Sequence, residues 1–298
     1  MIWCSTCQRA IREGEHLRTI IAVPSDTHSG STVGLMPSPW NLEDGGTYHA
    51  SPAQNEVLLA TWRRAWARIA QERKRSRLIV VVNGDPVDGI HHETAELVTR
   101  RREEQNRMHI AVMDEALKTA KFNRKKGDRL YYTWGTPAHG ASSSEEAIAR
   151  DLGAVPKGER YAWRRLRLQV NGQVIDIAHQ GAGVGRRAWT KENSLRNAVK
   201  SVYFNSLEAD RPVPRFYVRS HRHVWVAPQD HAGRHGTITG IITPAMQLKT
   251  EYAHKVAGDE VLSSVGVVWL IIEDDPRLSH WDVELFEYED ETSLEVIA

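Results

Sequence analysis

Carboxylate and imidazole side chains occur along this chain in short ordered groups. They are Asp26-Thr27-His28, Gly84-Asp85-Pro86-Val87-Asp88-Gly89, Gly135-Thr136-Pro137-Ala138-His139, His179, and His221-Arg222-His223. In an extended backbone, the first and third residues of Asp-x-His point to the same side. Carboxylate and imidazole together are good ligands for divalent transition metals. These groups therefore predict a metal site, provided that the fold brings them together.

Each group follows a segment that is typical of a β-strand. The predicted strands cover Arg18–Pro24, the start of Leu78–Gly89, Arg129–Trp134, Gln173–Ala178 and Arg215–Arg219. The run from Leu78 to Val82 is apolar and rich in β-branched residues, as in strands that are buried on both faces. Ligands of open α/β sheets bind at the carboxyl ends of the strands. We therefore expect the groups to meet at one edge of the fold.

Helical patterns separate the first three strands. Ser51-Pro52-Ala53-Gln54 has the form of a capping box, and Leu58, Trp62, Ala65 and Ile69 follow at helical spacing. A long helix is predicted over 94–121, and a short one from Ser142 or Ser143 to Gly153. The order β-α-β-α-β-α is that of a parallel sheet covered by helices.

The second half of the chain has a different pattern. Trp163–Val170 and Gln173–Ala178 flank Asn171-Gly172, a strong hairpin signal. A helix is predicted over 187–205, and further strands over 238–242, 265–272 and 280–288. We predict an N-terminal leader over residues 1–17 and one domain with two packed sheets over 18–298.

The charges of the 298 residues are unevenly distributed, although the net charge is only +1. Residues 273–298 hold ten acids and one base, which leaves 38 bases against 28 acids, or +10, in the rest. A basic body could attract polyanions such as DNA or RNA, and solvated helix faces are the alternative. No apolar run approaches the ~20 residues of a membrane span, and no signal-peptide pattern is present. We therefore expect a cytoplasmic protein without membrane association.

Cys4 and Cys7 form a C-x-x-C pair near the N-terminus. One pair supplies half of a structural zinc site, to which His16 could add one ligand. A flexible leader without metal is the favoured interpretation.

The ordered groups resemble the motif series of the calcineurin-like metallophosphoesterases. That series runs D-x-H, G-D-x-x-D-x-G, G-N-H-(D/E), a later H and G-H-x-H, and the resemblance covers roughly residues 20–225. It implies an α/β fold, a four-layer α/β/β/α sandwich of two packed mixed β-sheets flanked by helices. It also implies two metals, the first held by Asp26, His28, Asp85 and His223, and the second by Asp85, His179 and His221.

The chain departs from the series at two positions. Thr136 stands in the place of Asn, and His139 is displaced by two residues. His139 could ligate the second metal in place of Asn, which we favour, or protonate the leaving group. Ser220 replaces the usual Gly of the last motif. Asp88 is expected to orient its loop or a metal-bound histidine.

The resemblance implies hydrolysis of phosphoesters. Two metals ~3.5–4 Å apart can lower the pKa of a bridging water and neutralise charge on the phosphoryl group. The expected enzyme is a phosphodiesterase acting on nucleic acid or nucleotides, with Asp85 and His139 in catalysis. The alternatives are a phosphomonoesterase or small-nucleotide hydrolase, and a non-catalytic nucleic-acid-binding module.

Histidine with carboxylate suits Mn²⁺, Fe or Zn²⁺ better than Mg²⁺, and Mn²⁺ is favoured. Weaker candidates for substrate binding are His91, His92, Arg186 and Arg187. A surface loop and a solvated helix face are their alternative interpretations. The oligomeric state stays open.

Overall fold

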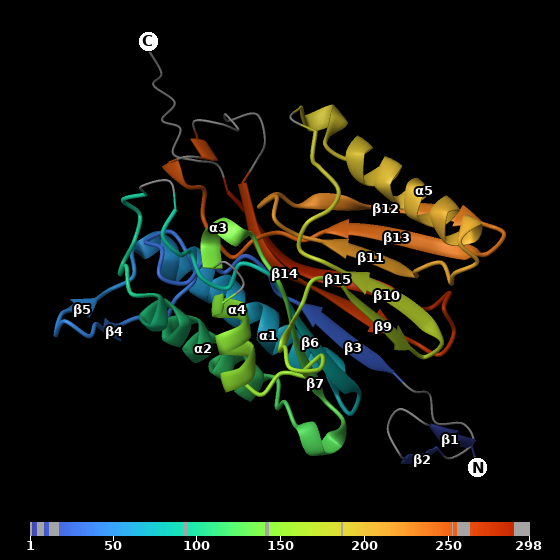
Figure 1. Ribbon diagram of the computed structural model, residues 1–298, viewed down its shortest axis with the longest axis horizontal. Helices are drawn as coiled ribbons and strands as arrows, with labels where there is room; N and C mark the ends of the chain where they lie inside the picture. Colours follow the sequence, from blue (N-terminus) through green and yellow to red (C-terminus); the bar gives the residue numbers. More distant parts are fainter. Residues whose placement is uncertain are drawn as a thin grey trace, which may run out of the picture.

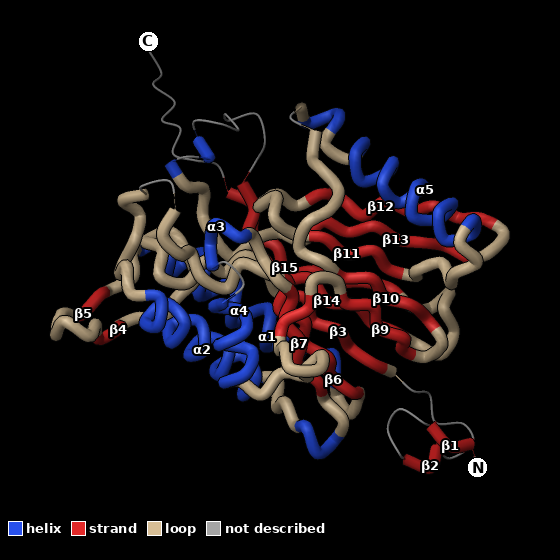
Figure 2. The backbone as a smooth tube through the Cα atoms, in the orientation of Figure 1, coloured by secondary structure: helices blue, strands red, loops and turns tan. Residues whose placement is uncertain are grey.

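The computed structural model describes residues 2–4, 9–11, 18–91, 94–140, 143–185, 187–251, 253–254 and 263–288. Two β-sheets pack against each other, and helices lie on the outer face of each sheet (Figures 1 and 2). The predicted α/β/β/α arrangement of two mixed sheets is therefore confirmed.

The first sheet has six strands. Its order is β15 (His280–Tyr288), β14 (Ser263–Ile272), β3 (Thr19–Val23), β6 (Arg77–Asn83), β7 (Arg129–Thr133) and β8 (Ala162–Trp163). The pairs β3–β6, β6–β7 and β7–β8 are parallel, whereas β14 is antiparallel to both of its neighbours. The carboxyl ends of the four parallel strands consequently meet at one edge.

The second sheet has five strands. Its order is β12 (Val226–Gly233), β13 (Gly236–Ile242), β11 (Phe216–Arg219), β10 (Gln173–Ile177) and β9 (Leu166–Val170). The three central strands are parallel, and both edge strands are antiparallel. Two small hairpins lie outside the sheets, formed by β1 (Ile2–Cys4) with β2 (Arg9–Ile11) and by β4 (Trp40–Asn41) with β5 (Thr47–Tyr48).

Strand β6 shows why the central strands are apolar throughout. Leu78, Val80 and Val82 pack on the helical layer, and Ile79 and Val81 pack on the second sheet. Since neither face meets water, an alternating polar pattern would leave polar groups buried without partners.

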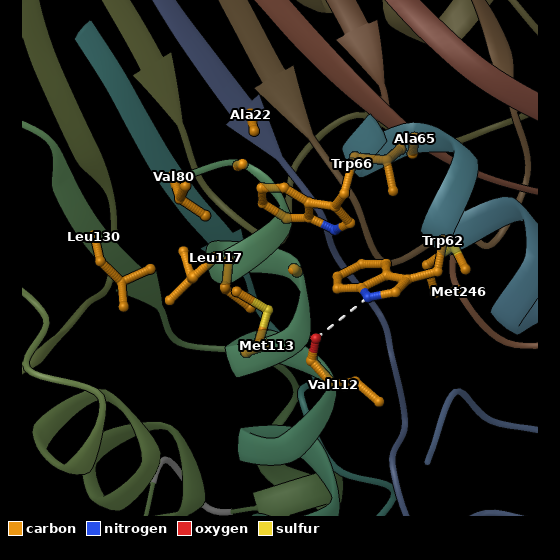
Figure 3. Packing of buried hydrophobic residues seen from close by; sticks show 14 of the residues in the cluster. Ala22, Trp62, Ala65, Trp66, Val80, Val112, Met113, Leu117, Leu130 and Met246 are labelled. Atoms are coloured by element: carbon orange, nitrogen blue, oxygen red, sulfur yellow. Dashed lines mark hydrogen bonds between the residues drawn. The ribbon is translucent and has the colours of Figure 1, made fainter. Parts of the chain in front are cut away.

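Three helices cover the outer face of the first sheet. They are α1 (Ala60–Arg73), which continues the π-helical segment η1 (Gln54–Leu59), α2 (Arg102–Thr119) and α4 (Ser143–Asp151). Figure 3 shows Trp62 and Trp66 against Met113 of α2, with the Trp62 indole donating to the Val112 carbonyl at 3.3 Å. Both tryptophans belong to the core.

The predicted capping box precedes η1. Gln54 N donates to Ser51 Oγ at 3.1 Å, and Ser51 N donates to Gln54 Oε1 at 3.0 Å. On the second sheet, α5 (Asn193–Glu208) packs over β12 and β13 (Figure 1). The short segments η2 (Arg124–Lys126), α3 (Pro137–Gly140) and η3 (Ala188–Thr190) are also helical.

Several predicted boundaries are wrong. The helix predicted over 94–121 begins only at Arg102, because Val98 N bonds to Gly30 O and Thr32 N to Glu96 O. The helix predicted over 187–205 covers Asn193–Glu208, after the separate turn η3.

The strand predicted over 163–170 is divided between the two sheets. Trp163 pairs with Thr133 of the first sheet, while β9 pairs with β10 in the second. Strand β12, rich in polar and small residues, was not predicted.

Cys4 lies in β1, whereas Cys7 and His16 lie outside the described residues. Over the described part of the chain, no helix is both long and apolar enough to cross a bilayer.

A buried ion pair joins helix α1 to two strands of the first sheet. Both Asp128 oxygens accept from the Arg73 guanidinium at the end of α1, at 3.0 and 3.1 Å. Asp128 also accepts from Leu78 N at the start of β6 and from Asn123 N before β7. The Asp128 side chain is fully buried, and that of Arg73 is 9% exposed.

Asp128→Ala should lower the free energy of unfolding by about 3–5 kcal/mol, because it leaves the Arg73 charge buried without a partner. The matched control is Glu115→Ala, which removes an exposed pair with Arg63 and should cost less than about 1 kcal/mol. Urea denaturation monitored by tryptophan fluorescence measures both. Equal losses in the two variants would contradict this role of the pair.

Candidate metal centre

The loops after β3 and β6 run side by side and position two of the predicted groups. Asp26 N donates to Gly84 O at 3.1 Å, and His28 N donates to Asp85 O at 3.2 Å. The pairing of two parallel strands thus continues beyond their ends. It presents Asp26, His28 and Asp85 on one edge, each about 1% exposed.

Five of the candidate ligands have a left-handed backbone. The φ angles are 50° at Asp26, 44° at His28, 48° at Asp85, 76° at His221 and 53° at His223. Such conformations cost roughly 1–3 kcal/mol each for residues other than glycine and persist only where the surroundings enforce them. Their concentration at these residues makes the edge a candidate functional site.

Glycines allow the ligands to approach one another. Gly84 has φ 84°, and a Cβ there would overlap the His179 ring. A Cβ on Gly135 would overlap Asp85. The glycines of two motifs therefore make room for the side chains of the centre.

The structure brings all seven predicted ligands together in overlapping groups. Within each group, one ligand atom from every member lies within 4.8 Å of the others; the groups are Asp26–His28–His223, His28–Asp85–His139 and Asp85–His179–His221. Asp85 belongs to two of them. A further group, Asp88–His91–His139, adjoins them.

Hydrogen bonds set the tautomers of three imidazoles. The Nδ1 atoms of His28, His139 and His179 lie 3.0 Å from Asp88 Oδ1, 2.8 Å from Asp88 O and 2.7 Å from Asn83 O, respectively. Because these oxygens accept, each Nδ1 carries a proton and each Nε2 is left as an acceptor. This arrangement is usual for histidines that ligate metals through Nε2.

The Nε2 atoms face further ligand atoms. His28 Nε2 lies 3.2 Å from His223 Nε2, and His179 Nε2 lies 2.9 Å from Asp85 Oδ2. The lone pair of His179 Nε2 and the Asp85 carboxylate repel each other at this distance unless a proton or a metal cation lies between them. Asp26 Oδ1 is buried and accepts no hydrogen bond, although His223 Nε2 is 3.3 Å away. The donor set therefore fits divalent metal ions.

The ionisation of these groups leads to the same conclusion. Burial opposes the charge of Asp26, but the neighbouring His179 and His223 lower its pKa to about 2. Burial likewise opposes the charge of Asp85, and His179 holds its pKa well below the usual range. Burial disfavours the His179 cation, yet Asp26 and Asp85 raise its pKa to about 9. The carboxylates thus need positive charge, which a proton on His179 supplies in the absence of metal.

Thr136 lies among the second set of ligands. Its Oγ1 is 2.9 Å from Asp85 Oδ2, 3.1 Å from His221 Nδ1 and 3.3 Å from His179 Nε2. The residue that stands in the sequence position of the motif's Asn therefore contacts three of the candidate ligands. His139 instead lies with His28, with ring centroids 4.6 Å apart.

A buried network beneath the centre joins the two sheets, and the motif analysis missed it. Asn83 Nδ2 donates to Ser220 Oγ at 2.6 Å, and Thr133 Oγ1 donates to Asn83 Oδ1 at 2.7 Å. Ser220 and Ser25 each share a hydrogen bond with Thr243, at 2.8 and 2.9 Å. Ser220, which replaces the usual glycine, is therefore part of the support. The only signal in the sequence was a polar residue at the end of several apolar strands.

His109 on α2 was also missed. Its Nδ1 lies 2.9 Å from Thr27 Oγ1, and its Nε2 lies 3.1 Å from the Tyr132 hydroxyl. Burial lowers the His109 pKa to about 3, so the ring is neutral. Since Thr27 Oγ1 donates to Pro86 O, His109 donates to Thr27 and holds it between Asp26 and His28.

The weaker substrate candidates have different surroundings. His91 Nε2 lies 3.4 Å from Asp88 Oδ2. The His91 ring packs edge-on against the His139 ring, with the ring centroids 4.3 Å apart. Arg187 is exposed over the ring of Trp189. His92 and Arg186 lie outside the described residues.

Comparisons with known proteins find little sequence similarity. No protein-family model matches the chain, and no curated protein matches it in sequence. Among solved structures, Termus thermophilus sulfate thiohydrolase SoxB in complex with glycerol matches at 11% identity and a TM-score of 0.33. The match covers 93% of this chain and 58% of that one, less than two thirds of its length. A TM-score this low supports no statement about activity.

Thr136→Val should weaken metal binding by about tenfold, since it removes a hydroxyl from the Asp85–His179–His221 group while keeping its shape. Thr136→Ser keeps the oxygen and is the matched control. Titration of the purified chain with Mn²⁺, followed by metal analysis after gel filtration, measures occupancy per chain. A valine variant that binds like the wild type would remove Thr136 from the ligand set.

Proposed function

We propose that this chain is a metal-dependent phosphoesterase that hydrolyses phosphodiesters of nucleic acid or nucleotides. The observation that carries the proposal is the sharing of Asp85 between two groups of metal-type ligands at the strand ends. Two divalent ions would be held as follows: the first by Asp26, His28, Asp85 and His223, the second by Asp85, His179, His221 and Thr136.

Bound together, two divalent ions would stabilise charge on the phosphoryl oxygens and lower the pKa of a water molecule. Side-chain and backbone groups of the chain orient the candidate ligands. Asp88 orients His28, and the Asn83 carbonyl orients His179. The mixture of imidazole and carboxylate favours Mn²⁺, with Fe and Zn²⁺ as alternatives.

Charge supports a polyanionic substrate. Outside residues 273–298 the chain carries the excess of ten positive charges described above, and Arg222 is exposed between His221 and His223. Cleavage of bis-nitrophenyl phosphate in preference to nitrophenyl phosphate, in added Mn²⁺, would support the diesterase. The reverse preference would favour a phosphomonoesterase. Salt-dependent binding of DNA without cleavage of either ester would favour a non-catalytic binding module.

Asp85→Asn should abolish hydrolysis, because a neutral amide does not bridge two cations as a carboxylate does. Initial rates on bis-nitrophenyl phosphate in saturating Mn²⁺ test this, with circular dichroism as the check on folding. Activity within about tenfold of the wild type, which is only ~1.4 kcal/mol in the barrier, would be incompatible with the bridging role.

We propose His139 as an additional ligand of the first metal, beside His28, because its Nδ1 donates to Asp88 O and leaves Nε2 as an acceptor. His139→Ala should then lose metal, and raising free Mn²⁺ should restore part of the activity. A general acid would behave differently. Metal content would stay normal, added Mn²⁺ would not help, and esters of poor leaving groups would lose ~10²–10⁴-fold, more than nitrophenyl esters. Normal metal content together with normal rates on both kinds of ester would exclude His139 from the centre.

A further inference from the structure

A cavity of about 600 Å³ has Trp134 in its lining, two residues before Thr136 of the candidate metal centre. Its volume is within the range of small-molecule sites. It is lined by residues from the end of β7, from α4 and from the loop before β8, chiefly Trp134, Glu146, Arg150, Glu159, Arg160 and Tyr161.

The backbone connects the cavity directly to the centre. Trp134 and Thr136 are two residues apart, so their Cα atoms are separated by at most ~7 Å. Gly135 N between them donates to Glu145 Oε1 at 3.0 Å, and Thr136 N donates to Asp85 Oδ1 at 2.6 Å. One wall of the cavity and a residue that bonds to Asp85 therefore belong to the same short backbone segment.

Internal hydrogen bonds hold the walls in place. Trp134 Nε1 donates to Glu146 Oε1 at 3.4 Å, and Tyr161 N donates to Glu146 Oε2 at 2.6 Å. Trp134 N donates to Trp163 O at 2.9 Å, and the Arg160 guanidinium lies 5.1 Å from the centre of the Trp134 ring. Both carboxylate oxygens of Glu146 thus accept hydrogen bonds, and they hold Trp134 and Tyr161 in position.

The remaining chemistry of the cavity suits a flat, polar ring. The indole, the phenol and the guanidinium offer planar faces for stacking. Arg150 and Arg160 are exposed donors, and Glu159 is an exposed acceptor. Few ligand groups are planar, aromatic and equipped with both donors and acceptors, and a nucleobase is one of them.

We propose that this cavity binds the base of a nucleotide whose phosphodiester lies at the candidate metal centre, with Arg160 as a stacking and specificity-determining residue. The inference rests on the proposed function and names its substrate class. It makes the nucleoside, and not only the phosphate, a recognised part of the substrate.

The test compares two diesters with the same nitrophenolate leaving group. Thymidine 5′-(4-nitrophenyl phosphate) carries a base, and methyl 4-nitrophenyl phosphate does not. The wild type should have a kcat/KM at least tenfold higher for the thymidine ester. Arg160→Ala should reduce this preference roughly tenfold, mainly through KM, and leave the methyl ester unaffected.

Arg164→Ala is the matched control. It removes the same charge from an exposed position nearby and should keep the wild-type preference. A wild type without preference, or an Arg160→Ala variant that loses both esters equally, would overturn the proposal for the cavity while leaving the phosphodiesterase intact.

A second measurement separates the two proposals. Failure to hydrolyse either ester in Mn²⁺ would contradict the proposed function. Binding of fluorescein-labelled dithymidylate in EDTA, followed by anisotropy, then tests the cavity without turnover. Arg160→Ala should weaken this binding roughly tenfold relative to Arg164→Ala, and equal binding by both variants would overturn the cavity proposal.

Discussion

The burial of several carboxylates at one site is the constraint on which the rest of this structure depends. Asp26, Asp85 and Asp88 are each at most 3% exposed, and a carboxylate so far from water is stable only among cations and hydrogen-bond donors. The imidazoles supply both, and five strand ends from two sheets are needed to bring them to the same place. The sandwich is thus the frame that an anionic ligand set requires.

The cost of this arrangement is visible in the backbone. Left-handed φ angles at five candidate ligands store conformational energy, and the network of Asn83, Ser220 and Thr243 opposes their relaxation. Bonds within the chain itself therefore position the candidate ligands. Preorganisation of this kind would lower the reorganisation needed for the proposed catalysis.

Much of the architecture could be predicted from the sequence because its causes are local. The double-sided burial of β6 leaves a continuous apolar run, and the parallel order follows from alternating strand and helix patterns. The candidate ligands could be named because they stand directly after those strands. Residues 94–101 could not be placed, since their backbone partners near Gly30 and Thr32 are far away in the sequence. Thr136 and His109 depend in the same way on neighbours that only the folded chain supplies.

Two consecutive glutamates on α4 form hydrogen bonds in two different parts of the structure. Glu145 holds the backbone of Gly135, beside the metal-type ligands, and Glu146 braces Trp134 and Tyr161 at the cavity. Because Glu145 and Glu146 are adjacent on one helix, that helix sets the distance between the candidate metal centre and the cavity. A molecule that occupies both the candidate metal centre and the cavity must match this distance. For the proposed substrate, length as well as charge then becomes a criterion for binding at this edge.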